Sequence, residues 1–147
     1  MIAELESLIL AGDWNAALAA IIAHMKADSG TIHVMGSDGN LHLRCASAGI
    51  PPPVVEIVRA VPVGKGMAGL AAERREPVSI CNIQTDTSGD VRPGARATGL
   101  EGAIALPMMA GETVAGVLGV ANREPRTFTA DETEELLAIG RALARFV

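Results

Sequence analysis

The chain has 147 residues, of which 49% are hydrophobic and 20% are charged, and its formal net charge is −5. This length suits one domain, over residues 1–147, with an apolar core of its own. The negative charge provides no electrostatic footprint for nucleic acid, and no apolar run reaches the length of a membrane-spanning helix. Acidic residues near the N-terminus are wrong for a signal peptide, and two cysteines are too few for a disulfide framework. We therefore expect a cytoplasmic protein with neither a nucleic-acid nor a membrane partner.

Two helices are expected at the N-terminus. Apolar residues at helical spacing run from Ile2 to Ile9, and Gly12 is a suitable stop. Asp13 can cap a second helix, whose apolar stripe comprises Trp14, Leu18, Ile21, Ile22 and Met25. The stripe can pack on the core of the domain, or it can serve a partner helix or a dimer. The pattern leaves both interpretations open.

A β-hairpin is expected next, because from Thr31 the apolar period changes to two. Asp38-Gly39 is the sequence signal of a tight hairpin turn. The register implied by this turn pairs Ile32 with Cys45, His33 with Arg44, Val34 with Leu43, and Met35 with His42. The apolar pairs then share one face of the sheet, and the two histidines lie diagonally on the other. A metal site needs further ligands, and none stands at a suitable spacing.

A glycine-rich turn dominates the middle of the chain. After a short helix expected up to Ala60, residues 63–69 read Val-Gly-Lys-Gly-Met-Ala-Gly and begin a second helix. Glu76-Pro77 ends that helix before a strand at 78–80. The free N–H groups of the helix start can hold an anion or a polar ligand group. The glycines also match a dinucleotide fingerprint, but that site requires a parallel βαβ unit, whereas these strands read as hairpins.

Residues 81–99 form a long, polar and glycine-rich segment, of a length at which loops are usually functional or mobile. Arg92 and Arg96 can hold a carboxylate or a phosphate through paired N–H groups. Neutral polar side chains such as Asn82 and Thr98 supply further donors and acceptors. The alternative is a lid whose polar groups satisfy one another or water.

A second hairpin and a final helix complete the chain. Gly111-Glu112 suits the hairpin turn, and Ile104, Leu106 and Met108 share one side of the strand before it. Several other strand positions are small, so we expect close packing on them: Ala103, Ala105, Ala115, Gly119 and Ala121. Thr129 and Glu132 form a capping box. It precedes a helix with the apolar stripe Leu136, Ile139, Leu143 and Phe146.

This order of elements resembles a GAF domain over essentially the whole chain. The specific marks are the glycine turn at 63–69 before Glu76-Pro77-Val78, the strand segment 116–120, and the segment 128–132. The resemblance implies an α/β (α+β) fold with a profilin-like, central antiparallel sheet of five or six strands. The N- and C-terminal helices would cover one face, and the short helices and the long loop would cover a pocket on the other. GAF domains bind cyclic nucleotides, bilins, haem, amino acids and other small effectors, and many dimerise through their terminal helices.

We therefore predict a small-molecule-binding sensory or regulatory domain, more a binding module than an enzyme. It would signal by contact with a partner protein or through a homodimer formed by its terminal helices. The sequence does not identify the ligand or any cofactor, and it indicates no catalytic set. The candidate ligand contacts are Gly66, Met67, Cys81, Asn82, Thr85, Asp86, Arg92, Arg96, Thr98 and Met108.

Two alternatives stay open beside the sensor. One is a ligand-free interaction domain that works through its terminal helices. The other is a redox enzyme: GAF enzymes that reduce free methionine sulfoxide use three cysteines in and near the glycine turn and the long loop. Here Met67 stands in the turn and only Cys81 is near the loop, while Cys45 is expected on the apolar side of its hairpin. Bilin-binding members have a histidine beside the cysteine, and neither cysteine here has one.

A segment near the C-terminus also resembles the Asn-Lys…Phe…Asp-Glu motif of cyclic-nucleotide-binding GAF domains. Asn122-Arg123, Phe128 and Asp131-Glu132 match it, with arginine in place of lysine and two residues rather than three between Phe and Asp. In that motif an ion pair has a structural role, so the resemblance implies a pair between Arg123 and Asp131. The capping box explains the same segment without a nucleotide.

Overall fold

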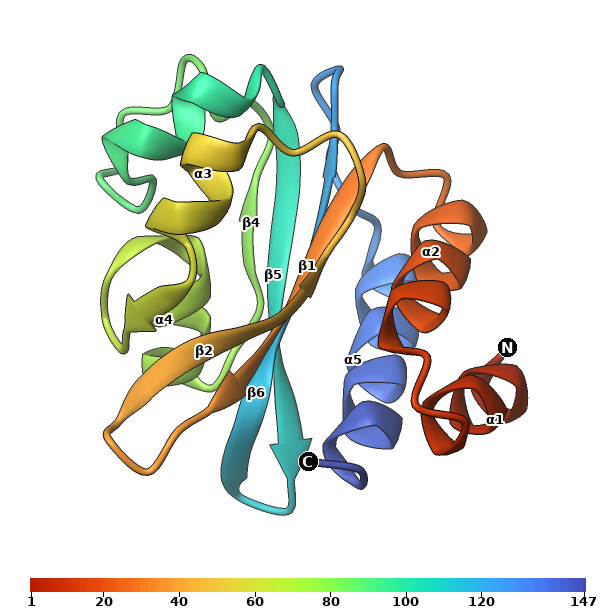
Figure 1. Ribbon diagram of the computed structural model, residues 1–147. Helices are drawn as coiled ribbons and strands as arrows, with labels where there is room; N and C mark the ends of the chain where they lie inside the picture. The colour runs from red at the N-terminus through yellow and green to blue at the C-terminus, as the bar shows by residue number, and fades with distance from the viewer.

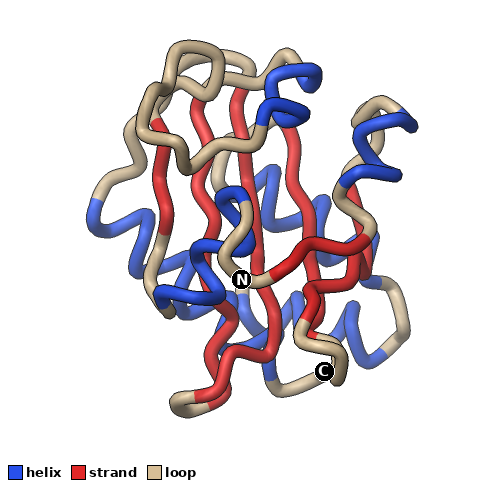
Figure 2. Tube along the Cα trace, turned by 90° about the vertical axis from the view of Figure 1, so that its left-hand side faces the viewer, coloured by secondary structure: helices blue, strands red, loops and turns tan.

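Six strands form one antiparallel sheet in the computed structural model, which describes residues 1–147. The order across the sheet is β3-β2-β1-β6-β5-β4, and every neighbouring pair is antiparallel. The strands are β1 (Ser29–Met35), β2 (Asn40–Ala46), β3 (Ala60–Pro62), β4 (Val78–Ile80), β5 (Gly102–Ala110) and β6 (Thr113–Asn122). Figure 2 shows them lying side by side. The predicted α+β fold with a central antiparallel sheet is confirmed.

The helices divide between the two faces of this sheet (Figure 1). One face carries α1 (Ile2–Leu10), α2 (Trp14–His24) and α5 (Ala130–Ala144). The other carries α3 (Pro52–Ile57), α4 (Gly66–Arg74) and the 3₁₀ helix η1 (Pro93–Thr98). The sequence thus places the terminal helices together, and the segments around the glycine turn and the long loop opposite them, as expected.

The face under the terminal helices is filled by large apolar side chains. Leu106 and Leu118 are fully buried there, together with Leu18 of α2 and Leu136 and Leu143 of α5. The helices begin where the sequence predicted. The Ala16 N–H donates to the Asp13 carboxylate at 3.0 Å, and the capping box of Thr129 and Glu132 is present.

Both hairpin turns are confirmed, but only one of the four residue pairs predicted for the first hairpin is right. Ile32 pairs with Cys45 as predicted. A bulge follows, so the structure pairs His33 with Leu43, Val34 with His42 and Met35 with Leu41. Arg44 is the extra residue, and its guanidinium lies 5.0 Å from the ring centre of Trp14. Because a bulge inserts one residue into the strand, Cys45 faces the terminal helices while Leu41 faces α4.

Two further expectations are wrong in detail. The short helix ends at Ile57 rather than Ala60, because Ala60 pairs with His42 as the first residue of β3. The expected pair of Arg123 with Asp131 is absent. Arg126 instead makes an ion pair with Glu132 and lies over the Phe128 ring, 4.2 Å from its centre.

Candidate functional site

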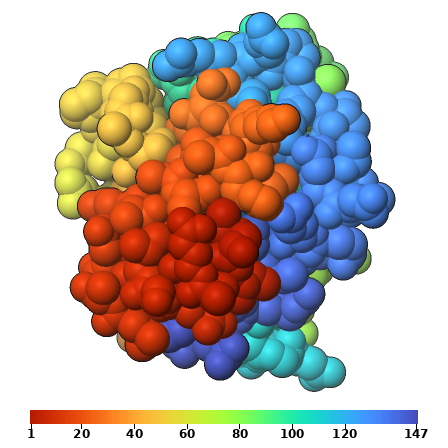
Figure 3. All heavy atoms as spheres, turned by 90° about the vertical axis from the view of Figure 1, so that its right-hand side faces the viewer, coloured from red at the N-terminus to blue at the C-terminus, as the bar shows by residue number.

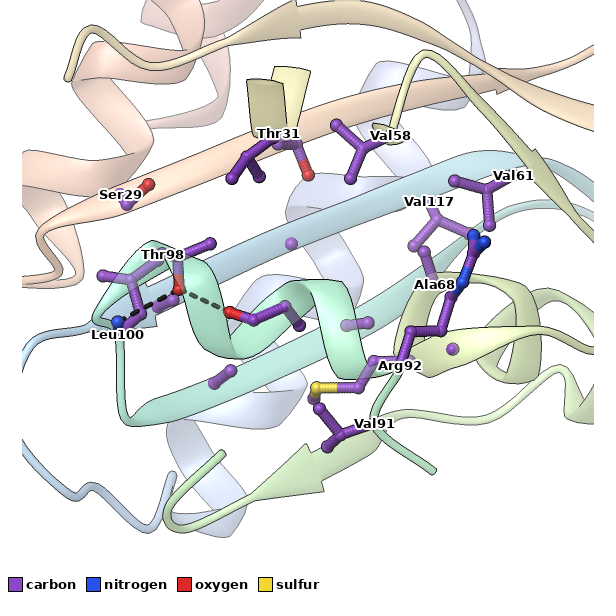
Figure 4. Close-up of a pocket in the computed structure, with 18 of the residues that line it drawn as sticks. Ser29, Thr31, Val58, Val61, Ala68, Val91, Arg92, Thr98, Leu100 and Val117 are labelled. Atoms are coloured by element: carbon purple, nitrogen blue, oxygen red, sulfur yellow. Dashed lines mark hydrogen bonds between the residues drawn. The ribbon is translucent and has the colours of Figure 1, made fainter. Parts of the chain in front are cut away.

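A cavity of about 200 Å³ lies between the sheet and the layer formed by α3, α4 and η1 (Figure 4). Of its 26 lining residues, 16 are hydrophobic, so its walls are mainly apolar. Its floor contains small residues from the neighbouring strands β5 and β6: Ala103, Ala105, Gly119 and Ala121. The expectation of close packing holds for Ala105, which is buried with Ala71 and Ala72 of α4, whereas above Gly119 the cavity leaves a space.

The roof of the cavity is made by short elements that meet each other. Ile57 of α3 lies against η1, where a Cβ added to Gly94 would be 3.5 Å from the Ile57 Cδ1 atom. The start of α4 forms one side, since Gly66 and Met67 line the cavity. Position 69 requires glycine because a side chain there would collide with the backbone carbonyl oxygen of Pro62. The glycine turn therefore serves close helix packing as well as the wall of the cavity.

Alternate residues of β1 bring polar side chains to the cavity: Ser29, Thr31 and His33. The Ser29 hydroxyl is 3.0 Å from the Ser47 hydroxyl, whereas the Thr31 hydroxyl has no hydrogen-bond partner in the protein. His33 is only 3% exposed, and its Nε2 donates to the Val58 carbonyl oxygen at 2.8 Å. Burial lowers the pKa of His33, which favours the neutral ring. Its Nδ1 is buried without any partner.

The charges at the cavity are all positive. Lys65 and Arg92 are its only charged lining residues, and neither forms an ion pair or a side-chain hydrogen bond within the protein. None of the 17 acidic residues lines it. Lys65 is also the N-cap of α4, and no side chain caps that helix. Figure 4 shows the Arg92 side chain extending from the long loop in the direction of Val61 and Val117.

Four of the predicted ligand contacts line the cavity: Gly66, Met67, Arg92 and Thr98. The others lie elsewhere, namely Cys81, Asn82, Thr85, Asp86, Arg96 and Met108. Met108 is fully buried on the opposite face of the sheet, against Gly140 of α5. Its strand position explains this, since Met108 shares a face with Ile104 and Leu106.

The long loop satisfies many of its own polar groups. Arg96 donates to the carbonyl oxygens of Ile83 and Asp86 at 3.3 and 2.9 Å. The Asn82 side chain accepts from the Gln84 N–H at 2.9 Å, and the Asp86 carboxylate accepts from the N–H and the hydroxyl of Ser88. The loop thus follows the alternative interpretation at these positions, and only the part that includes Arg92 and Thr98 reaches the cavity.

The two cysteines are far apart. Cys45 lies in β2 and Cys81 directly after β4, so four inter-strand spacings, roughly 19 Å, separate their strands. A disulfide needs Cα atoms within about 7 Å. Burial raises the pKa of the Cys45 thiol to about 11, while Cys81 is exposed outside the cavity. The fold therefore gives Cys81 no resolving partner within the chain.

The predicted ligand contacts did not include four polar residues that line the cavity: Ser29, Thr31, His33 and Lys65. A usable signal was present for three of them. Ser29, Thr31 and His33 alternate with apolar residues along one strand, so they had to share a face. Lys65 stands inside the glycine turn and precedes the helix start directly. The sequence did not show that the β1 side chains and Lys65 line the same cavity.

Comparison with known proteins identifies the family. The profile of the GAF domain family matches residues 15–147, and the chain belongs to this family. The structure is similar to the GAF domain of an Acinetobacter phosphoenolpyruvate-protein phosphotransferase. The identity is 21%, 99% of this chain and 89% of that chain are covered, and the TM-score is 0.79.

Two other solved structures show how widely the fold is used. The free methionine-R-sulfoxide reductase of Neisseria meningitidis, in complex with its substrate, has 14% identity, coverage of 99% and 84%, and a TM-score of 0.78. A domain of a putative two-component sensor histidine kinase protein from Sinorhizobium meliloti 1021 has 18% identity, coverage of 90% and 86%, and a TM-score of 0.70. At these identities the likeness concerns the fold alone. No curated protein sequence matches the chain, and no helix has both the length and the apolar character to cross a membrane.

Proposed function

We propose that this GAF domain is a sensor that holds one small molecule in the cavity beneath α3 and η1. The main support is the cavity itself, which has a floor of small residues where larger ones would fill the space. Sites for small ligands are commonly apolar pockets with a few convergent polar groups. Thr31, Lys65 and Arg92 supply such groups, and none of these three side chains is engaged elsewhere in the protein.

The volume limits the size of the ligand. An engineered apolar cavity of about 150 Å³ accepts benzene, and pockets for drug-sized ligands have about 300–1,000 Å³. A cavity of about 200 Å³ suits a single substituted ring or a short branched chain. A tetrapyrrole would require the roof to move away from the sheet.

The signal would arise from a shift between arrangements of the roof. A ligand that contacts both the sheet and α3 or η1 favours the arrangement in which these elements are closed. The sheet passes the difference to the terminal helices on its other face. We propose that the receiver is a second copy of the chain, or a partner protein, docked on those helices. A cytoplasmic location is part of this proposal, and the two unpaired cysteines support it.

The proposed homodimer would use the outer side of α1. Leu10 is 76% exposed, and Met1 and Ile2 are each 37% exposed. Figure 3 shows this side of the molecule, where the N-terminal helices (red to orange) lie against α5 (blue). Association would remove this apolar surface from water.

A thermal-shift screen of the purified protein tests the binding function. Nucleotides, amino acids, oxo-acids and apolar acids are offered one at a time. A ligand present at about 100 times its Kd adds about 2.7 kcal/mol to the free energy of unfolding, which corresponds to a Tm increase of about 5–10 °C for a chain of this size. The absence of a shift with every class would overturn the proposal.

The variant Gly119→Val is the matched control for this screen. A Cβ at Gly119 would meet only the Thr31 hydroxyl at 3.3 Å and the Ile104 carbonyl oxygen at 3.8 Å, so a valine side chain would extend into the cavity. Valine favours a strand more than glycine does. We expect a Tm without ligand at least as high as that of the parent protein, and no shift with any ligand. A ligand that shifts both proteins equally binds elsewhere.

The same screen separates the sensor from the redox alternative. Free methionine sulfoxide is included together with a thiol reductant, and methionine formation is followed by mass spectrometry. A binding module leaves the sulfoxide unchanged, and the variant Cys81→Ser keeps the full thermal shift. Formation of methionine that depends on Cys81 would contradict the proposal.

A further inference from the structure

We propose, building on the sensor function above, that the ligand is a small and largely apolar monocarboxylate. The walls of the cavity, its charges and its volume each restrict the ligand, and together they define this chemical class. The acid would place its carboxylate near Lys65 and Arg92 and its carbon skeleton over the small residues of β5 and β6.

The first restriction is the sign of the charge. The protein carries a net charge of −5, yet none of its acidic side chains lines this cavity. A ligand's ammonium group would lose its hydration on entering the cavity and would find no carboxylate there to form an ion pair. Burying an unpaired charge is costly. Free amino acids, including methionine sulfoxide, carry such a group at neutral pH. The cavity therefore disfavours zwitterions and cations.

The second restriction is the position of the positive charges. Lys65 immediately precedes α4, and the methylene groups of Arg92 lie against Gly66, where a Cβ would be 2.8 Å from the Arg92 Cδ atom. Both cations thus stand at the start of one helix, whose first N–H groups have no side-chain cap. A helix start attracts an anion, and a guanidinium binds a carboxylate through two parallel N–H groups.

The third restriction comes from the remaining walls. Val54, Val58 and Val117 face the space with no polar side-chain group. His33 adds no positive charge, because burial lowers its pKa. Its Nδ1 is buried beside the same cavity without a partner, and it is an acceptor because Nε2 donates to the Val58 carbonyl oxygen. A carboxylate cannot donate to this atom, so the charged end of the ligand is left to Lys65 and Arg92. One charged end and an apolar body match this arrangement better than a ligand with several charges.

The experiment compares molecules that share a skeleton and differ in charge. One series is 3-phenylpropionate, its neutral amide, and phenylalanine, which adds the ammonium group. The second is 4-methylpentanoate, its amide, and leucine. Binding to the full chain is measured by calorimetry at pH 7.5 in low salt. We expect the acid of at least one series to bind more tightly than its amide by about fivefold or more, and the amino acid to bind most weakly.

Charge variants locate the carboxylate. Arg92→Gln and Lys65→Gln each remove one cation at the cavity, and Arg141→Gln removes one exposed cation from α5 with the same change in net charge. Each cation is on the rim, where an ion pair contributes up to about 1 kcal/mol, equivalent to about fivefold in Kd. We expect each cavity variant to weaken binding of the acid by about three- to fivefold and to leave the amide unchanged. Arg141→Gln should change neither.

The outcomes separate this inference from the sensor function. If an amide or an amino acid binds as tightly as the acid, or if Arg141→Gln matches the cavity variants, the carboxylate class is wrong although the cavity is a ligand site. If no member of either series binds, the class is also wrong, and the sensor function then depends on the broad screen alone. If Gly119→Val still binds the acid with unchanged affinity, the site lies outside the cavity.

Discussion

The two faces of the central sheet are built from the same strands but packed differently. In β5, Ile104 and Leu106 point toward the terminal helices, while Ala103 and Ala105 lie under the cavity. In β6, Leu118 and Gly119 show the same division. Large side chains therefore fill one face, and small side chains leave space on the other. Because side chains alternate along a strand, neighbouring residues belong separately to the apolar core and to the cavity.

This difference has an energetic consequence. Full burial of a leucine or isoleucine side chain contributes about 1.5–3 kcal/mol, and the filled face holds most of the fully buried large side chains. On the cavity face, Leu41 is the one large side chain that is fully buried. A ligand could therefore occupy the cavity without disturbing the apolar core under the terminal helices, which contributes most to stability.

The largest expected effect tests the filled face. Leu118→Ala removes a fully buried side chain that packs among α2 and α5 residues. Such a change costs about 2–5 kcal/mol of unfolding free energy, because the lost transfer energy and the cavity term add. Urea denaturation measures it. The matched variant on the other face is Thr31→Val, which removes a hydroxyl without a protein partner and should change the stability by less than about 0.5 kcal/mol.

Equal losses in these two variants would break the comparison between the faces. A loss at Thr31→Val of the size expected for Leu118→Ala would mean that the Thr31 hydroxyl has a hydrogen-bond partner in the folded protein, because threonine and valine side chains have nearly the same shape.

Local signals predicted the parts of the fold that depend on a few neighbouring residues. Asp38-Gly39 and Gly111-Glu112 mark the two hairpin turns, and both glycines have positive φ, which other residues rarely adopt. The caps at Asp13 and Thr129 mark two helix starts, because each side chain accepts a hydrogen bond from a backbone N–H group three residues later. These features need no information from distant segments of the chain, so the sequence was enough.

The candidate site depended on distant segments and was predicted only in part. The sequence of β2 alternates between apolar and polar residues without interruption at Arg44. It therefore gives no sign of the bulge that shifts the register. Ala103 and Gly119 indicate either close packing or a cavity, and only the height of the roof decides between them. Arg96 and Arg92 look alike in sequence. One donates to carbonyl oxygens of its own loop, and the other borders the cavity.

A smaller effect, dependent on pH, tests the cavity face. Burial lowers the pKa of His33 from its ordinary value of 6.5. Below that value His33 binds a proton in the unfolded chain but stays neutral in the folded chain. The free energy of unfolding therefore falls as the pH falls from about 6.5. Above it the contribution is fully present. We expect unfolding experiments between pH 7.5 and 5 to show a steeper loss for the parent protein than for His33→Gln.

Two carboxylates whose pKa values are lowered titrate below this window. Hydrogen bonding lowers the pKa values of Asp38 and Glu132, so their contributions are lost only at more acidic pH and are common to both proteins. The comparison concerns slopes rather than absolute stabilities, because the glutamine changes packing as well. Identical slopes would mean that His33 is accessible to protons in the folded state and that the cavity side is open to water.

The smallest effect on stability, and the one that tests the outer layer of the filled face, is expected from Leu10→Glu. Leu10 is 76% exposed on α1, so a charge there should change the unfolding free energy of the monomer by no more than about 0.5 kcal/mol. If α1 forms a dimer, burial of a new charge in the interface should weaken association strongly. Light scattering at micromolar concentration should then show a dimer for the parent protein and a monomer for the variant. Val63→Glu, a matched change at a residue that is 38% exposed and lies outside the terminal helices, should stay dimeric. A parent protein that is monomeric at these concentrations would leave the terminal helices without a partner of their own kind, and a signal from the cavity would then have to reach a different protein.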